Sequence, residues 1–154
     1  MADGLYDTDF YQWTRQQADL LRSRDAASNA LDWERLAEEI EDMGKSEAHA
    51  CESHISSVLL HFLKLHLVRD RQPERHWRVE IKSFRIALRR RLSPSLEARL
   101  VGQIASLYAD ALALFVLQFE PDQLIAPAPD DSPWSFEDVL GRGEDWLPET
   151  ASIA

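Results

Sequence analysis

The stretch SEAHACESHISSVLLHFLKLHLV, residues 46–68, ends in a run where eight of eleven side chains are large and apolar. A helix that is apolar on nearly every face is one that other helices surround. A membrane-spanning helix needs roughly 20 apolar residues, which this stretch does not supply. We therefore expect a central core helix in an all-helical protein, with Val58, Phe62 and Leu65 almost fully buried.

Helical periodicity also covers the chain before this stretch. A first helix is expected from a cap at Asp7, Thr8 or Asp9 to about Arg24, and its apolar positions are Phe10, Trp13, Leu20 and Leu21. A second helix has apolar positions spaced three and four apart, at Trp33, Leu36, Ile40 and Met43. Gly44 and Ser46 then predict a break before the central helix. The apolar phase continues through them, which leaves one long helix as the alternative.

Prolines mark the later helix boundaries. Pro73 precedes a fourth helix over residues 74–92, and the Ser93–Pro94 pair begins a fifth helix that continues to Leu117 and folds back antiparallel. Residues 118–134 are an irregular proline-rich segment. A short final helix follows, capped by Ser135 with Asp138 completing a capping box, and Trp146 and Leu147 are expected to pack on the bundle.

Together these patterns predict an all-α, up-and-down helical bundle. We expect four to five main helices plus a short C-terminal helix, in a single domain of residues 1–154. No stretch alternates apolar and polar residues with turn signals between, so no sheet is expected.

Charge is distributed unevenly along the chain. The net charge of −10 argues against a general nucleic-acid binder, which needs a basic footprint. Residues 64–99, however, hold eleven basic and four acidic residues, a net of +7. A single cysteine, Cys51, excludes an intrachain disulfide, and the chain starts with an acidic, aromatic sequence. We expect a cytoplasmic protein with no membrane association.

Six cations recur at spacings of four and three along the predicted fourth helix, and they form the candidate interaction surface: Arg71, Arg75, Arg78, Lys82, Arg85 and Arg89. They extend over about 27 Å. We favour pairing with Glu34, Glu38 and Glu41 of the second helix, within one chain or across a dimer interface. The alternative is a phosphate-binding stripe for nucleic acid, which the acidic remainder of the chain would tend to repel.

Catalytic and metal-binding patterns are missing from the sequence. Neither Glu-x-x-His nor His-x-x-x-His pairs occur, and the few glycines form no phosphate-binding loop. His61 or His66 could join ligands on other helices, but we expect His61 to be a core histidine bonded to a neighbouring helix. Cys51 and His54 lie three residues apart in a setting that does not activate a thiol. We assign no catalytic residue, cofactor or metal.

The aromatic opening of the chain has two interpretations. Tyr6, Phe10 and Trp13 recur at helical spacing on one face. We expect this face to pack the N-terminal helix onto the bundle. The alternative is an exposed anchor for a partner, because aromatic residues are enriched at interface hot spots.

Five motifs in order resemble a known family: YDTDFYQW at 6–13, LAEEIEDMGKSE at 36–47, LLHFLKL at 59–65, QPERHW at 72–77 and SPSL at 93–96. The chain resembles, from about Leu5 to Glu149, the bacterial family catalogued as domain of unknown function 29. The resemblance implies an all-helical fold and a bacterial origin. It implies no reaction, because the family has no established activity.

The sequence therefore does not define a biochemical function. We expect a protein that binds another macromolecule, either a protein partner or a second copy in a homodimer, rather than an enzyme. One alternative is an enzyme or metal-binding protein whose site is assembled across helices. The other is nucleic-acid binding through the basic stripe of the fourth helix.

Overall fold

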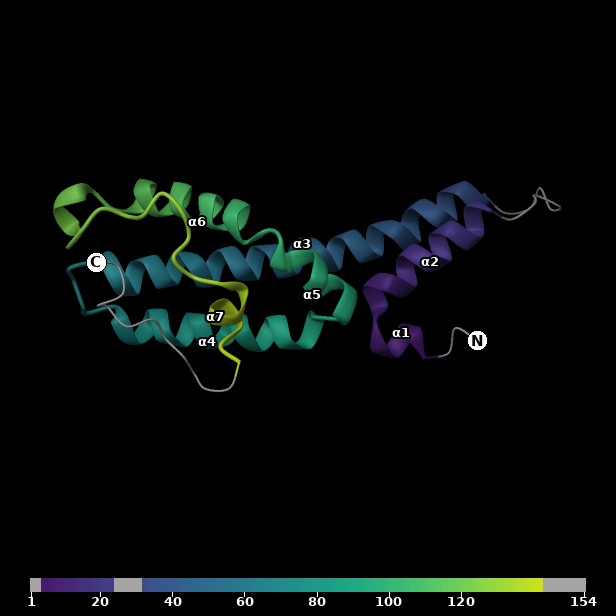
Figure 1. Ribbon diagram of the computed structural model, residues 1–154, viewed down its shortest axis with the longest axis horizontal. Coiled ribbons are helices and arrows are strands. Elements are labelled where there is room, and N and C mark those ends of the chain that lie inside the picture. Colours follow the sequence, from purple (N-terminus) through teal and green to yellow (C-terminus); the bar gives the residue numbers. More distant parts are fainter. Residues whose placement is uncertain (1–3, 24–31, 143–154) are drawn as a thin grey trace. The chain divides into compact units, whose positions relative to one another are not determined.

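The computed structural model describes residues 4–23 and 32–142, and these form an all-α protein (Figure 1). Its helices are α1 (Leu5–Thr8), α2 (Phe10–Arg22), α3 (Trp33–Leu67), α4 (Glu74–Arg91), α5 (Pro94–Val101), α6 (Ile104–Gln118), the 3₁₀ turn η1 (Pro121–Gln123) and α7 (Phe136–Leu140). The predicted fold class is confirmed. The expectations for Arg24, Trp146 and Leu147 lie outside the described residues.

The chain divides into two compact units. Among the described residues, the first unit comprises 4–23, 32–51 and 92–99, and the second comprises 52–91 and 100–142. Helix α3 contributes its first half to one unit and its second half to the other. The single domain expected from the sequence stays a prediction.

In the first unit, α2 packs against the first half of α3 through small side chains. Ala18, Ala37 and Ala48 have no exposed surface. A Cβ atom at Gly44 would overlap Thr14 Oγ1, so this glycine lets the two helices approach closely. The predicted break at Gly44 is therefore wrong, and α3 is continuous. A glycine within a helix costs only about 1 kcal/mol, which the packing against α2 offsets.

This close packing also changes which faces are buried. Tyr11, Thr14 and Ala18 are the buried residues of α2. The expected apolar positions Leu20, Leu36 and Met43 are instead exposed. These faces were predicted wrongly because the prediction relied on large aliphatic residues, whereas Thr14 and Ala18 are buried in their place together with Tyr11.

Asp9 holds two helix starts of the first unit together. Its Oδ1 accepts hydrogen bonds from Gln12 N at 3.0 Å and Ser95 Oγ at 2.7 Å, and its Oδ2 accepts one from Ser95 N at 2.8 Å. One carboxylate thus caps α2 and binds the first turn of α5. Burial alone would raise the pKa of Asp9, but these hydrogen bonds lower it below its ordinary value. The predicted cap at Asp9 is confirmed.

The second unit is built around the second half of α3. Val58 and Phe62 have no exposed surface and Leu65 is nearly as buried, which confirms the expected core. Figure 1 shows α4 and α6 alongside this half of α3. Phe84 of α4 packs on the rings of His54 and His61 of α3, and Ser56 Oγ donates to the Leu107 carbonyl of α6.

The predicted fifth helix is wrong as a single element. It is broken between Val101 and Ile104, where α5 and α6 are bent by 67°. Gly102 stands at this break, and the Gln103 amide donates to the Leu100 carbonyl in a tight turn. Among the described residues no single helix is long and apolar enough to cross a membrane. Only the bent pair of α5 and α6 meets that test, by length and composition alone.

The segment between α6 and α7 is irregular, as expected, but it is tied to the core. Residues Val68 and Leu124 form an isolated bridge, and Ile125 N donates to the Leu67 carbonyl at 2.8 Å. Trp134 is buried with its ring 5.2 Å from that of Phe62. The capping box of Ser135 and Asp138 at α7 is confirmed.

Candidate functional site

The six predicted cations of the candidate surface do not share one environment. Arg71 precedes α4, and its Nη1 donates to the Leu65 carbonyl at 2.7 Å. Arg75, Arg78, Lys82 and Arg89 are exposed on α4. Arg85 is only 2% exposed, so its place on an exposed interaction surface is a wrong prediction.

Arg85 belongs to the core of the second unit because α7 covers it. Its Nε donates to the Val139 carbonyl and its Nη2 to the Asp138 carbonyl, both at 2.8 Å. Its Cζ lies 5.6 Å from the centre of the Phe62 ring. A Cβ atom at Gly141, which has φ of 60°, would come within 2.5 Å of the guanidinium. Arg85 therefore fastens the C-terminal end of α7 to α4.

Two of the three predicted acidic partners of the basic stripe, Glu34 and Glu41, bind another residue. Arg22 of α2 contacts Glu41 Oε2 at 2.9 Å and Glu34 Oε1 at 3.4 Å. Glu74 Oε1 lies 2.7 Å from Arg78, and Glu74 Oε2 lies 2.8 Å from Arg71. The hydrogen bonds from Arg78 and then Arg71 lower the pKa of Glu74. These local contacts contradict the predicted pairing of Glu34 and Glu41 with the stripe within one chain.

The exposed side of α4 instead carries an alternating stripe of cations and apolar residues. Its members, spaced four and three apart, are Arg75, Val79, Lys82, Ile86 and Arg89. Val79 is 54% exposed and Ile86 is 40% exposed. The stripe is about 21 Å long at 1.5 Å per residue. We call these five residues the α4 face. Val79 and Ile86 were not predicted as part of this surface, because the predicted stripe was defined by charge alone.

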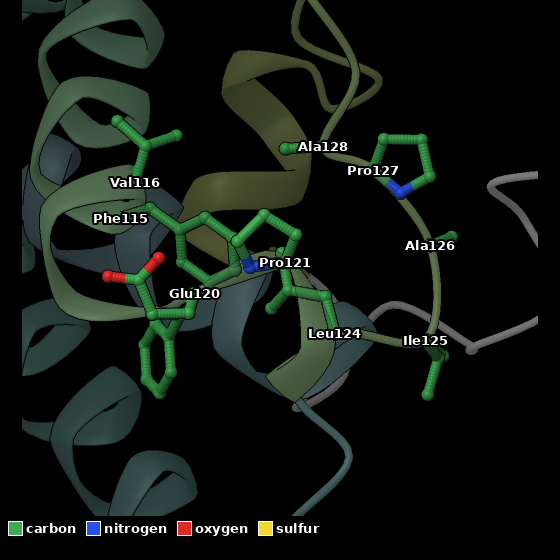
Figure 2. Close-up of a pocket in the computed structure, with 10 residues that line it drawn as sticks. Phe115, Val116, Glu120, Pro121, Leu124, Ile125, Ala126, Pro127 and Ala128 are labelled. Atoms are coloured by element: carbon green, nitrogen blue, oxygen red, sulfur yellow. The ribbon is translucent and has the colours of Figure 1, made fainter.

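A second feature, which the sequence analysis did not identify, is an apolar groove between the end of α6 and the following segment. Its volume is about 490 Å³, and nine of its ten lining residues are apolar. Figure 2 shows Phe115, Val116 and Pro121 on one side and Ile125 and Pro127 on the other. Glu120 is the one charged lining residue. The proline-rich segment was the sequence feature that could have predicted this groove, because its prolines hold the chain extended beside α6.

The buried histidines form no metal site among the described residues, where no group of three or more potential ligands comes together. His61 Nδ1 lies 2.7 Å from the Ser57 carbonyl of its own helix, so the expected bond to a neighbouring helix is wrong. His66 is buried beside Trp134, with ring centres 5.2 Å apart. Burial lowers the pKa of His66 to about 4 and also lowers that of His61.

The aromatic opening packs on itself. Ring centres of Tyr6 and Trp13 lie 4.9 Å apart, and those of Tyr6 and Phe10 lie 5.6 Å apart. Tyr6 remains about half exposed, whereas Phe10 and Trp13 are partly covered. The geometry fits a small cluster that stiffens the junction of α1 and α2 in the first unit.

Comparisons with known proteins agree with this description. A search of curated proteins found no match. The fold is similar to the crystal structure, at 1.45 Å resolution, of an alpha-helical protein of unknown function from Rhodospirillum rubrum ATCC 11170. The two chains are 25% identical with a TM-score of 0.76, and the alignment covers 90% of each. Residues 5–147 match the model of the domain of unknown function DUF29. The chain therefore belongs to the DUF29 family, whose biochemical function is unknown.

Proposed function

We propose that this protein is a protein-binding helical module and that the α4 face is its binding surface. One observation carries the proposal, namely the alternation of exposed cations with the exposed apolar side chains Val79 and Ile86. Apolar residues seven positions apart on a helix are the anchors by which two helices dock. Cations beside such anchors select a partner by charge.

The partner chemistry follows from this surface. We propose an acidic amphipathic helix of another protein, with apolar residues facing Val79 and Ile86 and carboxylates facing Arg75, Lys82 and Arg89. Charge complementarity supports this occupant, because the α4 face carries three cations and no carboxylate. Exposed ion pairs contribute little affinity, so the apolar anchors supply most of the binding energy.

Nucleic acid is the second candidate, and the three cations of the α4 face are the observation that favours it. Phosphate groups would contact Arg75, Lys82 and Arg89 but would leave Val79 and Ile86 without an apolar counterpart. The net charge of −10 also repels a polyanion. We therefore place nucleic acid second.

A peptide-binding experiment tests the proposal. The probe is a fluorescently labelled synthetic helix with leucines seven positions apart and glutamates between them, and a scrambled peptide of the same composition is the control. We expect saturable binding that weakens about tenfold in Val79→Gln/Ile86→Gln, which removes two half-exposed apolar contacts. The matched control Leu20→Gln/Leu36→Gln changes two exposed apolar residues elsewhere and should bind normally.

Three outcomes would contradict the proposal. The first is equal binding of the designed and scrambled peptides. The second is tight, salt-sensitive binding of a DNA duplex that Lys82→Glu abolishes and Val79→Gln/Ile86→Gln leaves unchanged, which would favour nucleic acid. The third is conversion of a dimer into monomers by Val79→Gln/Ile86→Gln, which would identify a second copy as the occupant of the α4 face.

We also propose a cytoplasmic location. The single cysteine supports it, because a chain without disulfides suits a reducing compartment, and Cys51 is buried as a small apolar residue. Fractionation of cells that produce the protein tests this, and recovery outside the cytoplasm would contradict it.

A further inference from the structure

Helix α7 ends beside the α4 face. Arg85 holds this end of α7 through two of its carbonyls, and Arg89, a member of the α4 face, donates to the Leu140 carbonyl at 3.5 Å. Gly141 then turns the chain with φ of 60°. Figure 1 shows α7 lying against α4. The chain that leaves α7 therefore starts at one edge of the proposed binding surface.

The sequence that continues from this point is both acidic and apolar. Residues 143–149, which lie outside the part of the chain that the structure describes, are GEDWLPE, and we call them the acidic segment. They hold three carboxylates, two large apolar side chains and no basic residue. The α4 face holds three cations and the exposed apolar side chains of Val79 and Ile86. The segment therefore matches the face in charge and in apolar content.

The α4 face is also within reach of the acidic segment. Arg89 and Ile86 are three positions apart on α4, and side chains at that spacing are neighbours about 5–6 Å apart. Val79 lies a further seven positions, or about 10 Å, along the helix. Trp146 follows Leu140 by six positions, and an extended chain of that length covers about 20 Å. Trp146 can therefore reach either exposed apolar residue of α4.

We propose that the acidic segment binds the α4 face of its own chain and competes there with the partner helix. In this arrangement Trp146 and Leu147 cover the exposed apolar residues of α4, and the carboxylates of the segment face the cations. The contact removes apolar surface from water on both sides. The competition rests on the proposed function, whereas the docking of the segment requires no partner.

The covalent link to α7 makes even a weak contact effective. A segment joined to its binding site through a few residues has an effective concentration of about 1 mM there. With a dissociation constant of about 0.1 mM for the free segment, the linked segment covers the face about ten times more often than it leaves it. A partner should then bind about tenfold more tightly to a chain whose segment cannot dock.

Fluorine NMR of the full chain, with its five tryptophans replaced by fluorotryptophan, tests the docking. The signal of Trp146 is identified by its loss in Trp146→Phe. We expect this signal to shift toward that of free fluorotryptophan in Val79→Gln/Ile86→Gln, because the ring loses its apolar contact. The matched control Leu20→Gln/Leu36→Gln changes two exposed apolar residues elsewhere and should leave the signal in place.

Peptide binding to the full chain tests the competition. The probe is the same labelled helical peptide of leucines and glutamates. Trp146→Gln/Leu147→Gln should bind it about tenfold more tightly than the wild type does. Added synthetic peptide GEDWLPET should reverse this gain, with a half-maximal effect at about 0.1 mM. Ile153→Gln, at an apolar residue beyond the acidic segment, is the matched control and should bind the probe as the wild type does.

The docking and the competition fail in distinguishable ways. A Trp146 signal that is the same in the wild type and in Val79→Gln/Ile86→Gln would overturn the docking. A signal that loses its shift on dilution from about 300 to about 10 µM would also overturn it, because the occupant would then be the segment of a second copy. Equal probe binding by the wild type and Trp146→Gln/Leu147→Gln would overturn the competition. If no variant binds the probe while the signal still responds to the α4 face, the docking is supported and only the proposed function is wrong.

Discussion

Helix α3 packs through small side chains over its first half and through large ones over its second half. Ala37, Gly44 and Ala48 are buried in the first unit, where Gly44 lies against Thr14 of α2, whereas Leu59, Phe62 and Leu63 fill the core of the second. Small residues bring backbones close together, so the first half is sensitive to added atoms. Large residues fill volume, so the second half is sensitive to lost atoms. The same helix is therefore destabilised by added atoms in its first half and by lost atoms in its second half.

The two halves of α3 also differ in how exposed their neighbouring polar groups are. Near the first half of α3, Arg22 pairs with Glu34 and Glu41 in contact with solvent, where salt screens the charges. Near the second half, Arg85 and His66 are buried. Buried polar groups are costly when they lose their partners or change charge, so these two residues offer sharper tests than the exposed pairs.

The largest effect is expected from Phe62→Ala. Its side chain has no exposed surface and contacts the Trp134 ring and the Arg85 guanidinium. Truncation should lower the free energy of unfolding by about 3–5 kcal/mol, measured by denaturant titration. Leu20→Ala, at an exposed position on α2, is the control and should change it by about 0.5 kcal/mol or less. A loss below about 1 kcal/mol for Phe62→Ala would show that this half of α3 is not the core.

Arg85→Met should come next, with a loss of about 2–4 kcal/mol, because the buried Val139 carbonyl and the partly buried Asp138 carbonyl lose a charged donor. Hydrogen exchange at the amides of Val139 and Leu140 should rise as α7 loosens. Arg78→Met, at an exposed position on the same helix, is the control and should leave α7 protected. Unchanged exchange in Arg85→Met would mean that α7 is held by its apolar contacts alone.

His66 should make stability depend on pH. Burial lowers its pKa to about 4 from an ordinary 6.5, so below pH 6.5 the unfolded chain binds a proton that the folded chain does not. Stability should therefore fall as the pH drops from 6.5 to about 4, by on the order of 2–3 kcal/mol. Denaturant titrations of wild type and His66→Leu across this range measure it. Parallel curves of unfolding free energy against pH for the two proteins would show that His66 contributes nothing to the pH dependence. His49→Leu, at an exposed histidine, is the control.

Gly44→Ala should have the smallest of these effects. The added Cβ overlaps Thr14 Oγ1, which costs more than the gain of about 1 kcal/mol in helix propensity, for a net loss of about 1–2 kcal/mol. Thr14→Ala should restore most of that loss in the double variant. A double-mutant cycle with denaturant titrations gives the coupling energy. If Gly44→Ala stabilises the protein instead, α2 and α3 are packed more loosely than the close approach of Gly44 to Thr14 indicates.

Local signals were enough to predict much of the fold. Helix periods and caps depend on residues within three or four positions of one another, so Asp9, Ser135 and Asp138 could be placed correctly. A run as apolar as residues 58–68 must be packed against other helices on all sides, which made the core prediction reliable. The spacing of the cations correctly predicted exposed positions on α4 for Arg75, Lys82 and Arg89, but it could not distinguish the buried Arg85 from them.

Other features depended on segments far apart in the chain. Arg85 lies at the margin of the predicted stripe, and whether it is exposed depends on α7, more than 50 residues later. The partner of Gly44 is Thr14, 30 residues earlier, and no local rule distinguishes a helix-breaking glycine from one that admits a neighbouring helix. The groove forms only because residues 124 and 125 bond to the end of α3.

The sequence by itself determined the all-α class, the central apolar helix, the main helix caps and the family. These follow from composition, periodicity and short motifs, all of which are local. Only the tertiary structure decided which arginine is buried, which faces of α2 and α3 meet, and where apolar surface remains uncovered. The physical reason is that burial is a property of neighbours, and those neighbours come from distant parts of the chain.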